Sequence, residues 1–299
     1  MSELDDYLTR QRGRVDAALA AEFPLDTAPP HRLLEAVRYS LLNGGKRLRP
    51  ILALAACEAV GGAAEAALPA ACALEMIHAY SLVHDDLPAM DDDAMRRGRA
   101  TTHVAFGEGV AILAGDALLT EAFALLSRRA LQAARPRPLL RVLAELAEAA
   151  GARGMVGGQA ADLAAAGAPA DMATVEFIHV RKTGALLLAS VRSGAHLGGA
   201  SAAALRRLSH YGECLGLAFQ IADDVLDAEG AIAATGKAAG GRDRALDKAT
   251  YPAVLGLPAA KARARELRDH ALAAVERFPA AADPLRAIAS YVVERAVGA

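Results

Sequence analysis

Two acidic clusters are the part of this sequence best suited to binding a hard cation. The first occupies residues 84–93 (HDDLPAMDDD) and follows an apolar segment, Leu74 to Val83, that we expect to be helical. Its five carboxylates lie within nine residues and repel one another, so solvent or bound cations must offset that cost. Taken alone, such a run is also typical of a solvated acidic helix end.

The second acidic cluster occupies residues 219–227 (FQIADDVLD). Asp223 and Asp227 are spaced i,i+4 and share a helix face, with Gln220 one turn earlier. Carboxylates stacked without basic partners destabilise a helix slightly, and cation coordination would reverse that sign. Oxygen ligands suit Mg²⁺, whereas zinc would require Cys or His. Two such clusters facing one cavity could hold Mg²⁺ ions around a diphosphate and stabilise a departing pyrophosphate.

Compact basic groups offer the positive partners that diphosphates need. They are residues 44–50 (GGKRLRP), the pair Arg96 and Arg97 after the first acidic cluster, and residues 181–184 (RKTG). His78 lies seven residues before Asp85, two helical turns away on the same face. Guanidinium groups suit bidentate phosphate contacts. Each group alone is equally typical of a solvated loop, of local charge neutralisation or, for His78, of a core histidine.

The elements that carry these residues are predicted to be helices. Alanine and leucine dominate, aromatic residues make up only 4% of the 299 residues, and no run shows the alternation of a strand. A polar loop is predicted from Gly230 to Ala249. Shorter connections are predicted at Pro29–Pro30, Gly61–Gly62, Gly107–Gly109, Pro136–Pro138, Gly167–Pro169 and Gly198–Gly199. No low-complexity linker divides the chain, so residues 1–299 are predicted to form one domain, a large helical bundle.

Taken in order, these motifs resemble the polyprenyl synthase family, in particular its short-chain bacterial farnesyl diphosphate synthases. Asp85-Asp86-x4-Asp91 resembles the first aspartate-rich motif of that family, and Asp223-Asp224-x2-Asp227 resembles the second. The resemblance covers residues 44–252. It implies an all-α fold of the isoprenoid synthase type around a central substrate cavity. It also implies Mg²⁺, three ions with substrate bound, held chiefly by Asp85, Asp91 and Asp223.

The resemblance implies a reaction that joins isopentenyl diphosphate to an allylic diphosphate, dimethylallyl or geranyl. Isopentenyl diphosphate is expected to contact Lys46, Arg49, His78 and Arg97. The allylic substrate is expected to contact Arg96, Lys182, Thr183, Gln220 and Lys237, which together with the three metal-binding acids form the expected catalytic set. Thr183 and Gln220 are candidates for stabilising the allylic carbocation.

Further elements of the family pattern are present with some departures. Residues 248–252 (KATYP) match one string, and residues 157–162 (GGQAAD) match another that is expected to support the site. Ala94 and Ala231 stand where acids are common, and the interval from Lys237 to Lys248 is about one residue longer than usual. These departures affect the expected geometry of the loop after the second motif.

Product length is predicted from the helix that precedes Asp85. At about 1.5 Å rise per residue, Tyr80 lies roughly 7.5 Å below the metal site, with Ser81 nearly beneath the carboxylate. A ring there would admit a short prenyl tail and block a longer one. In the family, an aromatic residue at this position accompanies farnesyl (C15) products. Packing in the core is the alternative for Tyr80, and geranylgeranyl diphosphate (C20) is the alternative product.

Composition excludes other classes of function. A formal net charge of -2 offers no basic field for nucleic acid. The cysteines at 57, 72 and 214 lack metal-ligand spacing and are expected to be buried in a protein of the cytoplasm. The acidic start at Met1 does not suit a signal peptide, and charges are expected to interrupt every apolar stretch before it could span a membrane.

Two competing functions share parts of this pattern. A terpene cyclase would pair one aspartate motif with an Asn/Ser/Glu motif and an aromatic pocket, and this chain has neither. A non-catalytic partner subunit would have lost acids that this chain keeps. A homodimer is implied by the family resemblance alone.

Overall fold

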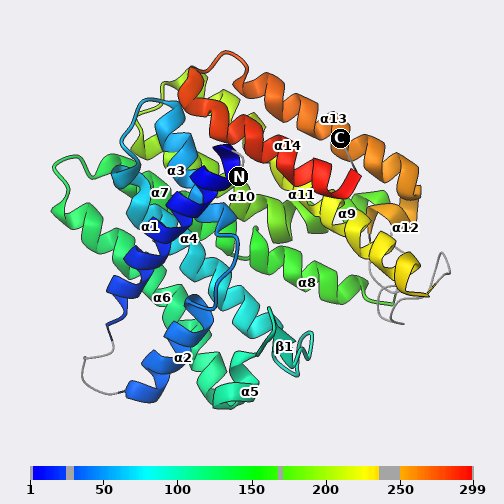
Figure 1. Ribbon diagram of the computed structural model, residues 1–299. Helices are drawn as coiled ribbons and strands as arrows, with labels where there is room; N and C mark the ends of the chain where they lie inside the picture. Colours follow the sequence, from blue (N-terminus) through cyan, green and yellow to red (C-terminus); the bar gives the residue numbers. More distant parts are fainter. Residues whose placement is uncertain (1–2, 25–29, 168–170, 236–249, 298–299) are drawn as a thin grey trace.

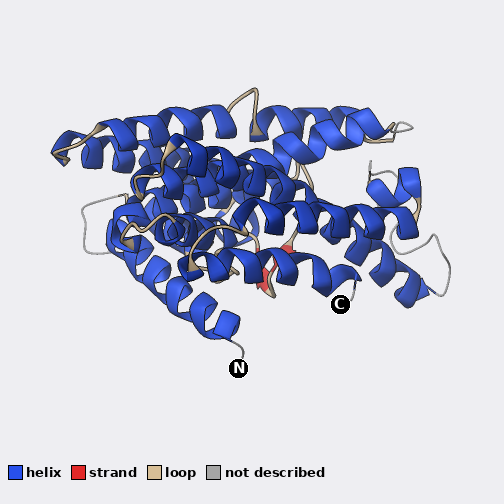
Figure 2. Ribbon diagram, turned by 90° about the horizontal axis from the view of Figure 1, so that it is seen from above, coloured by secondary structure: helices blue, strands red, loops and turns tan. Residues whose placement is uncertain are grey.

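The computed structural model describes residues 3–24, 30–167, 171–235 and 250–297, with the side chains of 231–235 excepted. Most of these residues are helical, as Figures 1 and 2 show, which confirms the predicted all-α fold. The first helices are α1 (Glu3–Glu22), α2 (His31–Leu41), α3 (Leu48–Ala59), α4 (Ala64–Asp85), α5 (Thr102–Phe106), α6 (Glu108–Gln132) and α7 (Arg137–Ala150). They are followed by α8 (Met155–Ala165), α9 (Met172–Ile178), the π-helix η1 (His179–Gly184), α10 (Ala185–Leu197), α11 (Ala202–Thr235), α12 (Tyr251–Leu255), α13 (Leu257–Val275), the 3₁₀ turn η2 (Ala280–Ala282) and α14 (Asp283–Val297).

A small antiparallel hairpin is the only β-structure among the described residues. Strand β1 (Met95–Arg96) pairs with β2 (Arg99–Ala100) immediately after the first acidic cluster. Sequence patterning did not predict it, because two residues per strand are too few to show an alternation. The hairpin lies beside the end of α4 (Figure 1). It carries Arg96 and Arg97, and Arg96 contacts Asp86 directly after α4.

Three of the predicted connections differ from the structure. In the connection predicted at Pro136–Pro138, Arg137 and Pro138 already belong to helix α7. Residues 230–235, placed in the polar loop by sequence, continue helix α11, and the rest of that loop (236–249) lies outside the described residues. Gly109 lies inside α6, so the connection there is Gly107 alone, with φ 90°. Residues 230–235 and the first turns of α6 both contain several alanines, and the helix propensity of alanine outweighs the unfavourable effect of one isolated glycine.

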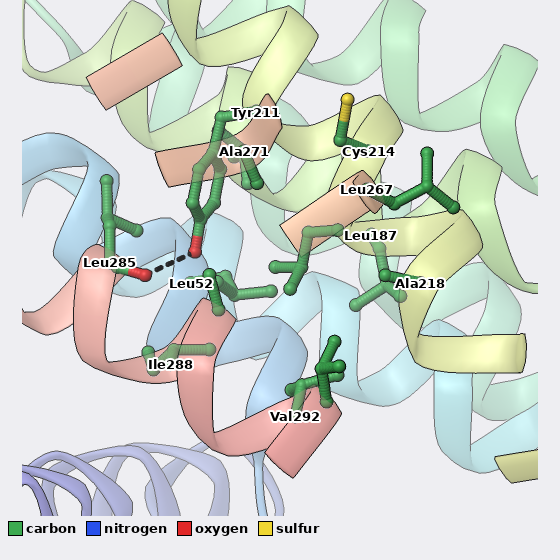
Figure 3. Close-up of a cluster of buried hydrophobic side chains, with 14 of the residues drawn as sticks. Leu52, Leu187, Tyr211, Cys214, Ala218, Leu267, Ala271, Leu285, Ile288 and Val292 are labelled. Atoms are coloured by element: carbon green, nitrogen blue, oxygen red, sulfur yellow. Dashed lines mark hydrogen bonds between the residues drawn. The ribbon is translucent and has the colours of Figure 1, made fainter. Parts of the chain in front are cut away.

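Apolar side chains form two large buried clusters. One joins α3, α10, α11, α13 and α14, and Figure 3 shows part of it, including Leu52, Leu187 and Ile288. Within it the Tyr211 hydroxyl donates a hydrogen bond to the Leu285 carbonyl at 2.7 Å, so the buried phenol is satisfied. The other cluster surrounds α4 with residues of α1, α2, α3, α6 and α7. Truncating one of these core leucines to alanine is expected to cost about 2–5 kcal/mol.

Helices α4 and α6 are long and apolar enough to cross a membrane by length and composition, although Glu75 interrupts the apolar sequence of α4 and Asp116 and Glu121 interrupt that of α6. In α4, 67% of the apolar window is buried inside the protein, and in α6, 39%. Helix α4 is apolar on all sides and lies in the core, as such helices do in soluble folds. Length and composition of one or two helices are weak evidence for a span.

Candidate active site

A cavity of about 550 Å³ lies between α3, α4, α8, η1 and α11. Asp85, at the C-terminal end of α4, and Asp223, in the middle of α11, both line it. The sequence-predicted site residues that line this cavity are Arg49, His78, Tyr80, Ser81, Asp85, Arg96, Arg97, Lys182, Thr183, Gln220 and Asp223. Residues predicted from five separate segments of sequence therefore surround one space.

The first acidic cluster divides its carboxylates between two environments. Asp85 faces the cavity, and burial raises its pKa to about 6, with the Lys182 charge opposing and the Asp91 charge adding to the shift. The chain turns back after α4, so the Asp91 amide donates a hydrogen bond to the Asp85 carbonyl at 2.8 Å. Asp91 thereby stays beside Asp85 although it is not among the residues that line the cavity.

Asp86 turns away from the cavity and binds Arg96. The Arg96 guanidinium donates two hydrogen bonds to Asp86 Oδ1, at 2.8 Å from Nε and 2.6 Å from Nη2. Asp86 is 3% exposed, so this ion pair is partly desolvated. Arg96, predicted to bind the allylic diphosphate, lines the cavity but already has this carboxylate as a partner.

Two cations, Arg49 and Arg97, line the same cavity together with His78. Burial is the main cause that lowers the pKa of His78 well below its usual value, and the neighbouring charges of Arg49 and Arg97 add to it. A neutral imidazole beside arginines can still donate a hydrogen bond. The Arg49 Nε atom is buried without a protein partner, which is expected where an anion is to be bound.

Arg97 is held by the glycines of residues 44–50. Its Nη1 donates a hydrogen bond to the Gly44 carbonyl at 2.6 Å, and its own backbone is left-handed, with φ 53°. Gly45 has φ 120°, a conformation that favours glycine, and a Cβ there would lie 2.5 Å from Arg97 Nη1, so glycine leaves room for the guanidinium in this position.

Lys46 is the predicted isopentenyl diphosphate ligand that does not line the main cavity. It lines an adjoining pocket of about 200 Å³ between α1, α11 and α14, together with Arg295. Burial and the Arg295 charge lower the pKa of Lys46. Lys46 and Arg49 are close in sequence but line different cavities. The reason is the left-handed backbone of Arg47 between them, with φ 51°, which the sequence did not predict.

Asp223 and Asp224, adjacent in the second cluster, also diverge. Asp223 lines the cavity and accepts a hydrogen bond from Arg295 of α14. Burial raises its pKa, and Arg295 opposes that shift. Asp227, one turn further along α11, is exposed and is not among the residues that line the cavity.

Asp224 points into the protein and joins three elements, α11, α12 and η1. It is 6% exposed, and its oxygens accept hydrogen bonds from Gln220 Nε2 and from the Tyr251 amide, both at 3.1 Å. His179 Nε2 lies 3.3 Å from Asp224 Oδ2, and the His179 ring stacks on that of Tyr251. Burial raises the pKa of Asp224 to about 7, and burial lowers the pKa of His179 to about 4, so we treat this contact as one of a neutral imidazole rather than as an ion pair.

Lys182 and Thr183 lie in the π-helix η1, a local widening that sequence patterning did not predict and that often accompanies functional sites. A Cβ at Gly158 would lie 2.2 Å from the Lys182 amide nitrogen, so glycine lets α8 approach η1. Lys182 Nζ donates a hydrogen bond to Asp162 of α8 at 2.6 Å. Thr183 donates one to Gln220 Oε1 at 2.7 Å. Asp162 thus has the supporting place expected of residues 157–162.

The structure adds a buried ion pair that sequence reasoning missed. Arg47 donates hydrogen bonds to Glu75 of α4 at 2.6 Å, to Asp16 of α1 at 2.7 Å and to the Leu41 carbonyl at 2.8 Å. Arg47 and Glu75 are each 3% exposed. The sequence contains one indication of a polar role for Glu75, because it lies three residues before His78 on the same helix face. The apolar residues around Glu75 make this indication easy to overlook.

Tyr80 and Ser81 line the cavity as predicted. The Tyr80 ring is 6% exposed and meets the His84 ring edge-on, with centroids 5.8 Å apart. His84 in turn is 3.0 Å from the Ile112 carbonyl of α6, which fixes the side chain behind Tyr80. The three cysteines are buried and free, as predicted.

The carboxylates that line the cavity supply the oxygen donors that Mg²⁺ prefers. Within the part of the chain that the structure describes, no three His, Cys, Asp or Glu side chains converge closely enough to hold a metal by themselves. Donors of that kind still fit Mg²⁺, because this ion keeps water and substrate oxygens among its ligands. Lys237, the remaining predicted ligand, lies outside the described residues.

Comparison of the sequence with known proteins gives the family of this chain. The polyprenyl synthetase family profile matches residues 30–284. The chain is 48% identical to a dimethylallyltranstransferase of Fischerella ambigua, covering 98% of this chain and 84% of the relative. It is 47% identical to a chloroplastic geranylgeranyl pyrophosphate synthase of Capsicum annuum, covering 97% and 78%. It is 45% identical to a farnesyl diphosphate synthase of Geobacillus stearothermophilus, covering 97% and 96%.

A solved structure shares the fold over almost the whole length of this chain. The crystal structure of an FPP/GFPP synthase from Zymomonas mobilis superposes with a TM-score of 0.87 at 41% identity, covering 97% of this chain and 98% of the other. The fold, the cavity and the sequence similarity lead to one assignment: this chain is a prenyltransferase of isoprenoid biosynthesis and belongs to the polyprenyl synthetase family.

Proposed function

We propose that the chain condenses isopentenyl diphosphate head-to-tail with dimethylallyl or geranyl diphosphate and releases mainly farnesyl diphosphate and pyrophosphate. The observation that carries this proposal is a single cavity with carboxylates at one place and, at another, a separate group of two arginines, Arg49 and Arg97, with the neutral His78 imidazole. One diphosphate with metal ions would need only the carboxylates. A second anion site beside them supports a reaction that joins two diphosphates.

The proposed reaction begins as the allylic C–O bond breaks and its electron pair leaves with pyrophosphate. Lys182 and Arg96 contribute positive charge where the leaving group gains negative charge. Thr183 presents an oxygen atom to the allylic carbon as it becomes a cation. The double bond of isopentenyl diphosphate then attacks that carbon, and the proton lost afterwards is accepted by pyrophosphate.

Mg²⁺ is the proposed cofactor, held chiefly by Asp85, Asp91 and Asp223. When bound, it would supply positive charge beside the leaving diphosphate. The protein's own contribution is to keep Asp85 at the end of α4 and Asp223 in the middle of α11 on the same cavity. Lys182, already near enough to lower the pKa of Asp85, is placed to share the same substrate oxygens.

The cavity also supports the proposed product length. Tyr80 closes part of the space on α4 below Asp85, and its ring is backed by His84. A second candidate product, geranylgeranyl diphosphate, is favoured by the 47% identity to the Capsicum annuum enzyme, which is named for that product.

The test is to incubate the purified protein with Mg²⁺, labelled isopentenyl diphosphate and each allylic primer, and to measure product length by chromatography. We expect C15 as the main product. A C20 main product would support the second candidate. The Asp85→Asn variant is the matched control, because it removes the charge without changing the side-chain size. Absence of any extended product from the unaltered protein would contradict the proposed activity and favour a non-catalytic subunit.

We further propose that two copies of the chain pair through α5 and α6. These helices expose Val104 (53%), Ile112 (44%) and Leu113 (56%), an apolar surface that a second copy would cover. Light scattering coupled to gel filtration should give the mass of a dimer. Replacing Ile112 and Leu113 together by Glu should give a monomer, and a monomeric unaltered protein would contradict this proposal.

A further inference from the structure

We propose that Asp224 is a positioning residue: it fixes the Gln220 amide so that Thr183 presents oxygen lone pairs, not its hydroxyl hydrogen, to the allylic carbon. The inference rests on the proposed function, because it concerns the carbon that becomes cationic in that reaction. It gives Asp224 a place in the reaction other than metal binding.

Asp224 is placed for this role by its contacts. Thr183, Gln220 and Asp223 line the cavity, whereas Asp224, next to Asp223 along α11, is 6% exposed and faces inward. One Asp224 oxygen accepts a hydrogen bond from Gln220 Nε2 and the other accepts one from the Tyr251 amide, each at 3.1 Å. The Tyr251 amide belongs to the backbone, so that donor cannot turn away from the carboxylate.

The hydrogen-bond pattern leaves one orientation for each group. In its ionised form the Asp224 carboxylate only accepts hydrogen bonds, so the Gln220 nitrogen must face Asp224 and its oxygen must face Thr183. A hydroxyl has a single hydrogen, and Thr183 donates that hydrogen to Gln220 Oε1 at 2.7 Å. The lone pairs of Thr183 Oγ1 are then free on the side of the cavity, where Thr183 is a lining residue.

This orientation is the one that favours ionisation. As the C–O bond breaks, its electrons leave with pyrophosphate and the carbon develops positive charge. An oxygen lone pair held toward that carbon stabilises the charge, whereas a hydroxyl hydrogen in the same place would oppose it. Because the dipole is already oriented before the reaction, no reorganisation is needed when the charge appears.

Asp224→Asn should reverse the orientation without changing the size of the side chain. The Tyr251 amide requires an oxygen, so the Asn nitrogen must face Gln220 and the Gln220 amide must turn over. Its nitrogen then donates to Thr183 Oγ1, and the hydroxyl hydrogen is free to point into the cavity. Gln220→Met is the second variant, because it releases the Thr183 hydroxyl and leaves the contact between Asp224 and the Tyr251 amide in place.

The experiment measures binding of two diphosphates of the same shape by calorimetry at pH 8 with Mg²⁺. One carries a trimethylammonium group on a two-carbon chain, and the other carries a neutral tert-butyl group in its place. We expect Asp224→Asn and Gln220→Met each to lower the preference for the cationic compound about tenfold, the size of one hydrogen bond or dipole to a charge. Asp223→Asn, the matched control, should weaken the binding of both compounds equally.

A double-mutant cycle on turnover completes the test. The loss of kcat caused by Asp224→Asn should disappear in a Thr183→Val background, where no hydroxyl remains, and persist in Thr183→Ser. An equal loss in the valine background, an unchanged preference between the two compounds, or a higher Mg²⁺ requirement like that of Asp223→Asn would overturn the inference. Failure of the unaltered protein to extend any primer would instead contradict the proposed function, and the binding comparison remains readable without turnover.

Discussion

Arg295, in the last turn of α14, donates a hydrogen bond to Asp223, the carboxylate of the second acidic cluster that lines the cavity. The same guanidinium lies 5.1 Å from the centroid of the Phe219 ring, one turn earlier on α11. The C-terminal helix therefore places a positive charge on a carboxylate that is proposed to bind Mg²⁺. The guanidinium and the metal would compete for the same oxygen atoms.

Arg295→Gln is expected to strengthen Mg²⁺ binding. The ion pair is partly exposed, so removing it should change the free energy of metal binding by no more than about 1 kcal/mol, or about fivefold in affinity. Calorimetric titration of Mg²⁺ at pH 8 measures the change. Arg286→Gln is the control, because Arg286 lies on the same helix but bonds to Asp283 and to carbonyls at the end of α13. Unchanged or weaker binding in Arg295→Gln would contradict the competition.

The sequence predicted the parts of the site that depend on local spacing. Asp85 and His78 lie two turns apart on α4, and Asp223 follows Gln220 by one turn on α11, so helical periodicity alone places each pair on one face. The all-α fold followed for the same reason, because alanine-rich helical segments carry their signal within a few turns. The order of the motifs then identified the family.

Contacts between distant segments could not be predicted from one sequence. Arg295 is 72 residues from Asp223, and Lys182 is 20 residues from Asp162, so no local period connects them. The left-handed backbone of Arg47, which separates Lys46 from Arg49, is a conformation imposed by tertiary contacts, because an arginine rarely adopts it by itself. The Gly, Lys, Arg and Asp residues between 230 and 249 predict a polar loop as a whole, whereas the alanines among residues 230–235 continue helix α11.

Arg47 and Glu75 form a buried ion pair close in sequence to Arg49 and His78. Removing one partner should lower the free energy of unfolding. Glu75→Gln leaves the Arg47 charge with a weaker partner in a desolvated place, so the free energy of unfolding should fall by about 3 kcal/mol. Denaturation by urea measures this change. The Michaelis constant for isopentenyl diphosphate should also rise, since Arg47 lies between Lys46 and Arg49.

The exposed pair Arg263 and Glu266 is the control for that prediction. Glu266→Gln removes a carboxylate from a surface ion pair, so the free energy of unfolding should change by less than about 1 kcal/mol. Equal losses in Glu75→Gln and Glu266→Gln would show that burial of the Arg47 pair contributes nothing to stability.

Tyr80→Ala is expected to lengthen the products. The substitution removes a ring that lines the cavity below Asp85, and the space released extends toward His84. Chromatography of the products should show chains beyond C15. Tyr80→Phe keeps the ring and should leave the product length unchanged, so an unchanged C15 limit in Tyr80→Ala would argue that another residue sets the length.

Asp85 is expected to make metal binding depend on pH near 6. Burial raises its pKa to about 6, so the fold favours the protonated form. In the metal-free protein, this group therefore contributes stability below the pKa of an unfolded aspartate, about 3.9, and that contribution is lost as pH rises through about 6. The affinity for Mg²⁺ depends on pH in the opposite direction and rises with pH, because Mg²⁺ binds the ionised carboxylate and must displace the proton.

Two titrations check both signs. From pH 7 down to pH 5, the affinity for Mg²⁺ should fall by about tenfold per pH unit once the pH is below 6. Over the same range, the free energy of unfolding without metal should rise relative to Asp85→Asn, which has no charge to lose. Burial also raises the pKa of Asp223 and Asp224, so only the difference between the unaltered protein and Asp85→Asn isolates this group. Parallel pH profiles for the two proteins would mean that Asp85 does not titrate in this range.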